Sequence, residues 1–158
     1  MANALKRREY AGSEIVSKGD EVVIEYTNVF EKNMACTSKL VSNRGGSRSS
    51  KSYSLAQLFW SRFFNCKGRQ ILIVRKTLPA LRISTYLLMM SLADKYGFRD
   101  YIKEEKQNMN LWHNGSLIHF GGVDDPEKIK STEWNDIWME EANEFAYEDF
   151  VQLSLRLS

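Results

Sequence analysis

The sequence predicts an α/β fold in which helices flank a mostly parallel sheet. Residues 71–74 form a continuous, mostly β-branched apolar run, which is typical of a parallel strand covered on both faces. Residues 53–64 carry apolar side chains at helical spacing and directly follow a loop rich in glycine and serine. Residues 136–139 form a second apolar strand that ends in two carboxylates. A chain of 158 residues with this pattern suits one domain with a sizeable core.

The chain begins with a weakly patterned segment. Residues 1–20 are polar and irregular, and residues 21–30 alternate only in part, which suits a strand or a short helix. Residues 38–43 have Leu40 and Val41 at their centre and predict a short buried strand. The expected order is therefore an arm, a strand, a loop and a helix.

The loop at residues 44–52 is the candidate functional centre. Successive backbone N–H groups in such a loop form an anion-binding concavity, and the following helix adds the partial positive charge of its N-terminus. Lys51 would reach the terminal phosphates of a nucleotide, and the Ser52 hydroxyl would hold Mg²⁺. The candidate cofactor-binding residues are Gly45, Gly46, Ser47, Arg48, Ser49, Ser50, Lys51 and Ser52.

The spacing within this loop matches the P-loop pattern G-x-x-x-x-G-K-[ST] except at one position. Gly45 lies six residues before Lys51, as the pattern requires, whereas Ser50 stands where the second glycine belongs. A side chain there must accept a tight backbone path that glycine takes more easily. The alternative interpretation is a Gly/Ser-rich surface loop with incidental basic residues.

The next helix has recognisable boundary signals. Thr77 is a candidate N-cap, Pro79 falls in the first turn, and Gly97 closes the helix. Its expected core positions are Leu81, Leu87, Leu88 and Leu92. Residues 110–122 then predict a hairpin around an Asn-Gly turn, and residues 147–157 predict a last amphipathic helix.

Two adjacent carboxylates follow the strand at residues 136–139. In an open parallel sheet, ligands bind beyond the carboxyl ends of the strands, so Glu140 and Glu141 are expected to face the phosphate loop. Glu140 would hold Mg²⁺ through water, and Glu141 would orient and deprotonate an attacking water molecule. The alternative is that a helix N-terminus collects acidic residues because its dipole favours them.

Charge is distributed unevenly along the chain, although the net charge is only +2. Residues 39–82 contain ten Lys or Arg and no Asp or Glu, whereas residues 131–158 contain seven acidic residues and one basic residue. This asymmetry fits a phosphate-facing half and a metal-facing half, or two solvated faces of opposite sign. Two widely spaced cysteines, no signal-peptide pattern and no membrane-length apolar run predict a protein of the cytoplasm.

The combination resembles the N-terminal part of the ATPase domain of phage terminase large subunits, the motors that package DNA. The matching segments are residues 45–54, 73–77, 121–128 and 136–145, in the order of the family. The resemblance implies a P-loop NTPase fold of the RecA/ASCE type over residues 38–158, present in part. Residues 1–37 would be an N-terminal arm and lead-in segment.

The resemblance also implies roles and partners. Lys51 would be the Walker A lysine, Ser52 and Glu140 the Mg²⁺ ligands, Glu141 the catalytic glutamate, and Arg48 a catalytic arginine. Arg75 and Arg82 are alternative arginines that would act on a neighbouring subunit. ATP and Mg²⁺ would be the cofactors. Double-stranded viral DNA, the terminase small subunit, the portal and further copies in a ring would be the partners.

The chain stops one helix after the acidic pair, whereas the family continues into a further strand and a nuclease domain. In the related ATPase fold, that strand inserts between the strand at residues 38–43 and the strand at residues 136–139. We therefore expect little ATP hydrolysis unless the missing part is supplied, and no nuclease activity. The alternatives are another helicase-like P-loop ATPase, a kinase, or a non-catalytic nucleotide- or protein-binding fragment.

Overall fold

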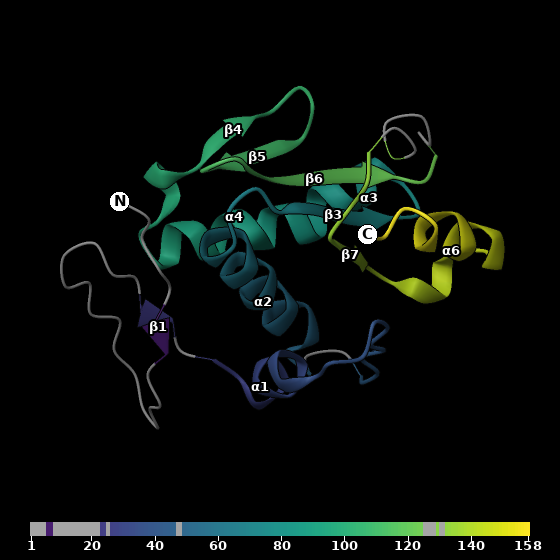
Figure 1. Cartoon of the computed structure of the whole chain (residues 1–158), viewed down its shortest axis with the longest axis horizontal. Helices are drawn as coiled ribbons and strands as arrows, with labels where there is room; N and C mark the ends of the chain where they lie inside the picture. The colour runs from purple at the N-terminus through teal and green to yellow at the C-terminus, as the bar shows by residue number, and fades with distance from the viewer. Residues whose placement is uncertain (1–5, 8–22, 25, 47–48, 125–128, 130–131) are drawn as a thin grey trace.

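A five-stranded mixed sheet organises the part of the chain that the structure describes (Figure 1). The computed structural model describes residues 6–7, 23–24, 26–46, 49–124, 129 and 132–158. The strands of this sheet, in spatial order, are β4 (Lys103–Glu105), β5 (Asn110–His113), β6 (Ser116–Gly122), β3 (Gln70–Arg75) and β7 (Asp136–Met139). A separate parallel pair joins β1 (Lys6–Arg7) to β2 (Val23–Ile24).

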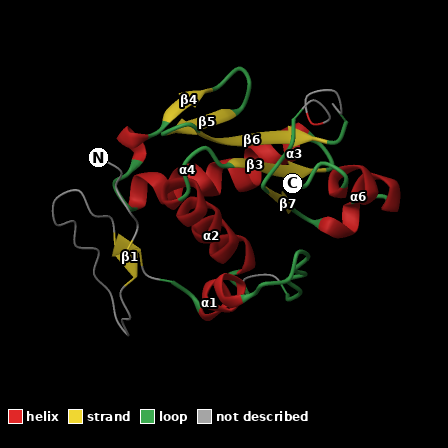
Figure 2. Ribbon diagram, in the orientation of Figure 1, coloured by secondary structure: helices red, strands yellow, loops and turns green. Residues whose placement is uncertain are grey.

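Helices lie against both faces of the sheet (Figure 2). They are α2 (Lys51–Asn65), α3 (Leu78–Leu81), α4 (Leu87–Lys95) and α6 (Tyr147–Ser154), while α1 (Asn28–Ala35) packs on α2. A π-helical turn, Arg82–Tyr86, joins α3 to α4, and 3-10 turns span Arg99–Tyr101 and Ala142–Glu144. Among the described helices, none combines the length and apolarity that crossing a bilayer requires.

Strand β3 is the centre of the sheet and is buried on both faces. It pairs in parallel with β6 on one side and with β7 on the other. Because side chains alternate along a strand, Ile71 and Ile73 enter one hydrophobic cluster while Leu72 and Val74 enter the other. The apolar run therefore forms the predicted parallel strand.

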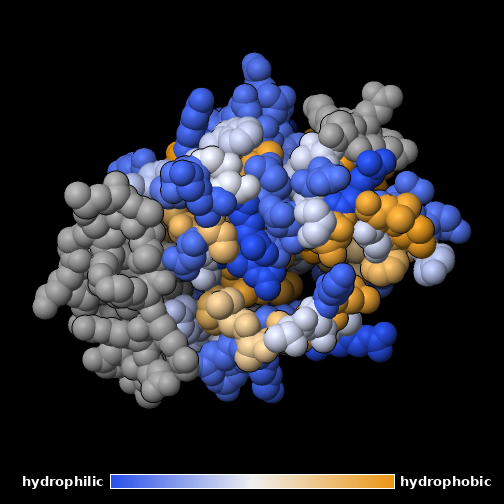
Figure 3. Space-filling view, in the orientation of Figure 1, coloured by the Kyte–Doolittle hydropathy of each residue, from blue (hydrophilic) through white to orange (hydrophobic). Residues whose placement is uncertain are grey.

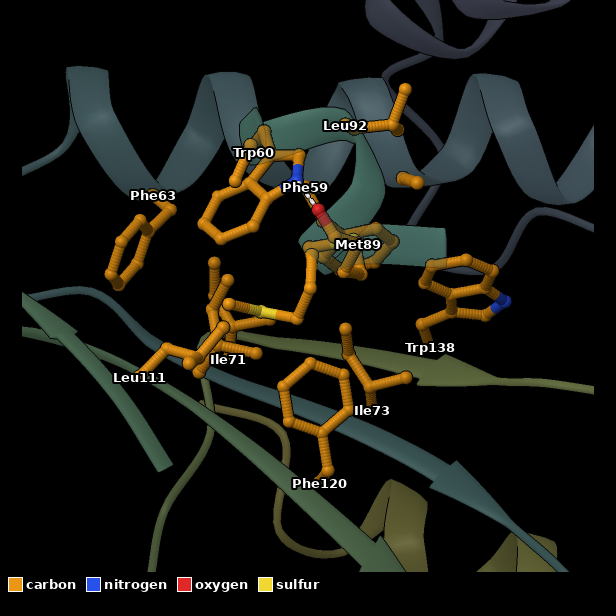
Figure 4. Close-up of a cluster of buried hydrophobic side chains, with 14 of the residues drawn as sticks. Phe59, Trp60, Phe63, Ile71, Ile73, Met89, Leu92, Leu111, Phe120 and Trp138 are labelled. Carbon is orange, nitrogen blue, oxygen red and sulfur yellow. Dashed lines mark hydrogen bonds between the residues drawn. The ribbon is translucent and has the colours of Figure 1, made fainter. Parts of the chain in front are cut away.

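One face of the sheet is covered by α2 and α4. Trp60 and Phe63 of α2 are fully buried against Ile71 and Met89, and the Trp60 indole N–H donates to the Met89 carbonyl at 3.1 Å (Figure 4). This confirms the helix predicted at residues 53–64 and its packing on a sheet. The wide aromatic face of α2 therefore belongs to the core, and it anchors the helix that follows the loop on the sheet.

The opposite face is covered by α6 and the segment before β7. Leu153 packs beside Trp134 in the second cluster. Hydrophobic side chains also gather on the surface over α6 (Figure 3), where Leu155 is 72% exposed. The spacing predicted that the last helix ends at residue 157, but it ends at Ser154.

The predicted hairpin and the helix after Thr77 are also present. Asn114 and Gly115 both have positive φ, 47° and 81°, as a two-residue turn requires. Gly97 has φ +70° beyond the end of α4. The prediction of Leu87 as a core residue is wrong, because its side chain is 55% exposed. Thr85, Met89 and Leu92 are buried at helical spacing from Leu81, and Leu87 lies off that face.

The strand predicted at residues 38–43 is wrong. This segment is irregular, and Leu40 and Val41 are 68% and 44% exposed. A strand forms only where a neighbour accepts its backbone hydrogen bonds, and no described strand pairs with this segment. Among the described strands, β7 pairs only with β3, and a cavity of about 920 Å³ separates it from residues 38–45.

Candidate functional site

The loop at residues 44–52 enters α2 through a strained residue. Ser50 has φ 59° and ψ 12°, in the left-handed region that favours glycine, and its carbonyl accepts the Ser54 N–H at 2.9 Å. The departure from the P-loop pattern therefore falls at a position that demands a glycine-like backbone. A non-glycine residue there costs about 1–2 kcal/mol.

Lys51 turns its side chain back onto the loop. Its ammonium donates to the Gly45 carbonyl at 2.5 Å, to the Gly46 carbonyl at 3.0 Å and to Ser49 Oγ at 2.9 Å. These contacts account for the three donors of the ammonium group. The Lys51 ammonium is therefore held by carbonyl and hydroxyl oxygens of the loop residues that the structure describes.

The remaining loop residues differ in how the structure places them. A side chain at Gly45 would come within 3.0 Å of Ser49 Oγ, so glycine permits a close approach there. Gly46 is exposed and has open space around it. Ser47 and Arg48 lie outside the described residues.

The acidic pair follows β7 directly. Glu140 is 9% exposed, and its N–H donates to the Val74 carbonyl of β3 at 2.8 Å. Glu141 is exposed and adopts a left-handed conformation with φ 52° and ψ 56°. A 3-10 turn follows, and it is closed by the Glu144 N–H donating to the Glu141 carbonyl at 2.8 Å. Two adjacent carboxylates therefore have different surroundings, one enclosed and one in solvent.

The loop and the acidic pair meet at one edge of the sheet. Ser52 Oγ donates to Glu140 Oε1 at 3.0 Å, although the two residues are 88 positions apart. Because β3 and β7 are parallel, their carboxyl ends lie together, and α2 begins at the same edge. The arrangement brings Lys51, Ser52, Glu140 and Glu141 to the wall of the same cavity.

Burial raises the pKa of Glu140, and the neighbouring Glu141 charge raises it further. The Ser52 hydrogen bond and the Arg75 charge oppose this increase. The enclosed carboxylate is therefore less readily ionised than a glutamate in water, and a bound cation would favour its charged form.

Several structural contacts of this region were not foreseen from the sequence. Asn33 of α1 and Asn43 exchange two amide hydrogen bonds of 3.0 Å, which hold the segment before the loop. Arg62 of α2 and Arg69, just before β3, both bind Asp136, which is 7% exposed. The opposite charges of residues 39–82 and 131–158 were the one signal for such pairs, but they did not indicate the partners.

Comparison with known proteins identifies the family. The chain matches a family model described as phage terminase large subunit over residues 39–158. It is 36% identical over 115 residues to the PBSX phage terminase large subunit of Bacillus subtilis (strain 168), a match that covers 72% of this chain and 26% of that protein. The chain thus spans about a quarter of the length of this curated relative.

Two solved structures share the fold. The ATPase domain of the Thermus phage P74-26 large terminase has a TM-score of 0.67 at 14% identity, covering 84% of this chain and 61% of that one. The large terminase of a thermophilic bacteriophage, solved in complex with ADP, has a TM-score of 0.59 at 16% identity, covering 72% and 29%. The α/β fold predicted from the sequence is therefore that of terminase ATPase domains. With a family model that covers most of its length, the chain belongs to the phage terminase large subunit family.

Proposed function

We propose that this chain is the nucleotide-binding part of an ATP-driven motor that moves viral DNA into a capsid. The observation that carries the proposal is the 3.0 Å hydrogen bond from Ser52 Oγ to Glu140 Oε1, which joins the loop to the acidic pair. A phosphate loop and a carboxylate must meet in this way if one metal ion is to touch both. Family membership supports DNA as the substrate that is moved, and the ADP complex of the thermophilic phage terminase supports the nucleotide.

The residues at the junction fit Mg²⁺. The Ser52 hydroxyl and the Glu140 carboxylate are hard oxygen donors, and Mg²⁺ is usually held by one or two such groups together with water and phosphate oxygens. We assign these two residues as its protein ligands. When bound, the ion would neutralise charge on the phosphates.

The other residues have distinct proposed roles. The Lys51 ammonium would exchange the Gly45 and Gly46 carbonyls for phosphate oxygens, since its donors already converge in the loop. Glu141 presents an exposed carboxylate beside the proposed metal ligand and would take a proton from the attacking water. We retain Arg48 as the proposed catalytic arginine on the family resemblance, because it lies outside the described residues.

A second candidate function is nucleotide binding without turnover by this chain alone. It is favoured by the cavity between residues 38–45 and β7, and by the exposed Leu40 and Val41 on its wall. A strand supplied by a further segment or another chain would pair with β7 and cover these side chains.

The small subunit, the portal and a ring of copies are proposed partners of the assembled motor.

Nucleotide binding tests the site directly. We expect Lys51→Ala to weaken ATP binding by about 10–100-fold, because hydrogen bonds to charged groups contribute about 1.5–3 kcal/mol. Lys67→Ala, an exposed lysine past α2, is the matched control and should leave the affinity unchanged. Ser52→Ala should remove most of the Mg²⁺ dependence of binding. Equal affinities for wild type and Lys51→Ala would remove the basis of the proposal.

Hydrolysis distinguishes the motor from the binding fragment and from other ATPases. The chain alone should turn over ATP slowly, and the chain joined to a downstream half of a terminase should turn it over faster and respond to DNA. A turnover by the isolated chain equal to that of the joined protein would contradict the need for a further strand. Hydrolysis that DNA leaves unchanged would favour a different class of P-loop ATPase.

A further inference from the structure

Arg75 is fixed at the carboxyl end of β3 by contacts on two sides. Its guanidinium donates to both carboxylate oxygens of Glu144, at 3.0 Å and 3.2 Å, and to Ser84 Oγ at 3.3 Å. Ser84 Oγ in turn donates to the Ala80 carbonyl at 2.7 Å. The planar fork of an arginine suits this two-point contact, which fixes direction as well as distance. Arg75 therefore links the helical segment after β3 to the turn after β7.

The turn that Arg75 contacts contains the strained Glu141. This residue holds its left-handed conformation while the turn Ala142–Glu144 closes behind it. A left-handed backbone at a residue other than glycine persists only where the surrounding structure holds it. Glu144 closes the turn through its N–H to the Glu141 carbonyl and anchors it through its carboxylate to Arg75.

The local charges are consistent with this link. Hydrogen bonding to Arg75 lowers the pKa of Glu144 below its usual range. Glu144 is the chief cause of the raised pKa of the Arg75 guanidinium, and the charges of Glu141 and Glu140 raise this pKa further. One cation thus offsets three carboxylates that follow one another within five positions.

We propose that Arg75 and Glu144 form a positioning pair that holds the turn closed and so sets the direction in which Glu141 points its carboxylate. In this proposal the pair acts through Glu141 and not directly on the nucleotide or on the attacking water. The inference rests on the proposed function, in which Glu141 accepts the proton of the attacking water. The simpler alternative is an ion pair that contributes only to stability, and the test must separate the two.

The turn can be tested without activity. We expect Arg75→Ala and Glu144→Gln to speed amide hydrogen exchange at Glu144 by at least 10-fold in the 158-residue chain, measured by NMR. The Ser54 amide, which donates to the Ser50 carbonyl within α2, is the internal reference and should not change. Lys76→Ala is the matched variant, because Lys76 makes the neighbouring ion pair with Asp149. Unchanged exchange at Glu144 in both variants would overturn the inference.

Kinetics in a form of the protein that hydrolyses ATP test the consequence. Arg75→Ala and Glu144→Gln should each lower kcat at least 10-fold while nucleotide Kd stays within about 2-fold, and Lys76→Ala should change neither. The charge reversal Arg75→Glu with Glu144→Arg should recover part of kcat. Loss of stability with kcat unchanged would reduce the pair to a structural contact. Failure of Lys51→Ala to weaken nucleotide binding would instead refute the proposed function, whatever the exchange at Glu144.

Discussion

Ser50→Gly should stabilise the protein, because it removes backbone strain at the entry of the loop into α2. Ser50 has φ 59°, and a residue with a Cβ in that region costs about 1–2 kcal/mol. Glycine loses more chain entropy on folding, about 0.5–1 kcal/mol. The Ser50 side chain makes no capping hydrogen bond, so little else is lost. The expected gain is about 0.5–1 kcal/mol in the free energy of unfolding.

Thermal and urea unfolding measure this gain. For a chain of this size, about 1 kcal/mol shifts Tm by about 2–4 °C, so Ser50→Gly should raise Tm by about 1–4 °C. Ser50→Ala keeps the strain and should stay within about 0.5 kcal/mol of wild type. Gly97→Ser is the reverse control: it adds a side chain at φ +70° in open space and should destabilise by a similar amount. A Ser50→Gly protein no more stable than Ser50→Ala would refute the assignment of strain to this residue.

Three further predictions concern stability. Asp136→Asn should lower the free energy of unfolding by about 1–3 kcal/mol, measured by urea titration. This is less than the 3–5 kcal/mol typical of a broken buried pair, because Arg62 and Arg69 are about a third exposed and regain water. No change in stability would mean that these ion pairs are incidental. Leu81→Ala should cost about 2–5 kcal/mol and Leu87→Ala less than about 0.5 kcal/mol, since their side chains are 0% and 55% exposed. Equal losses would contradict the assignment of Leu81 to the buried face and of Leu87 to the exposed face of this helical segment. Folding raises the pKa of Glu140, so the free energy of unfolding should fall as pH rises from the ordinary glutamate pKa through the folded value. Glu140→Gln should therefore be more stable than wild type at neutral pH and equally stable in acid. A difference between the two proteins that stays constant across pH would contradict the burial argument.

Local sequence was enough to predict most of the elements and the family. The apolar run at residues 71–74, the helical spacing at residues 53–64 and the Asn114 and Gly115 turn each specify a backbone period or conformation through neighbouring residues. The loop pattern and the acidic pair also lie on the expected elements, a helix N-terminus and a strand end. These features need no knowledge of distant segments, which is why one sequence sufficed to predict them.

Which groups meet depends instead on the packing of distant segments. Residues 38–43 carry the composition of a strand but have no described neighbour to accept their hydrogen bonds, so they remain irregular. The basic segment 39–82 and the acidic segment 131–158 were interpreted as two functional halves or two solvated faces. In the structure their charges form ion pairs between elements, as at Asp136 and between Arg75 and Glu144. The contact between Ser52 and Glu140 depends on the parallel register of β3 and β7. Pairing and burial arise from segments far apart in the chain, and their free energy is set by geometry that local pattern does not encode.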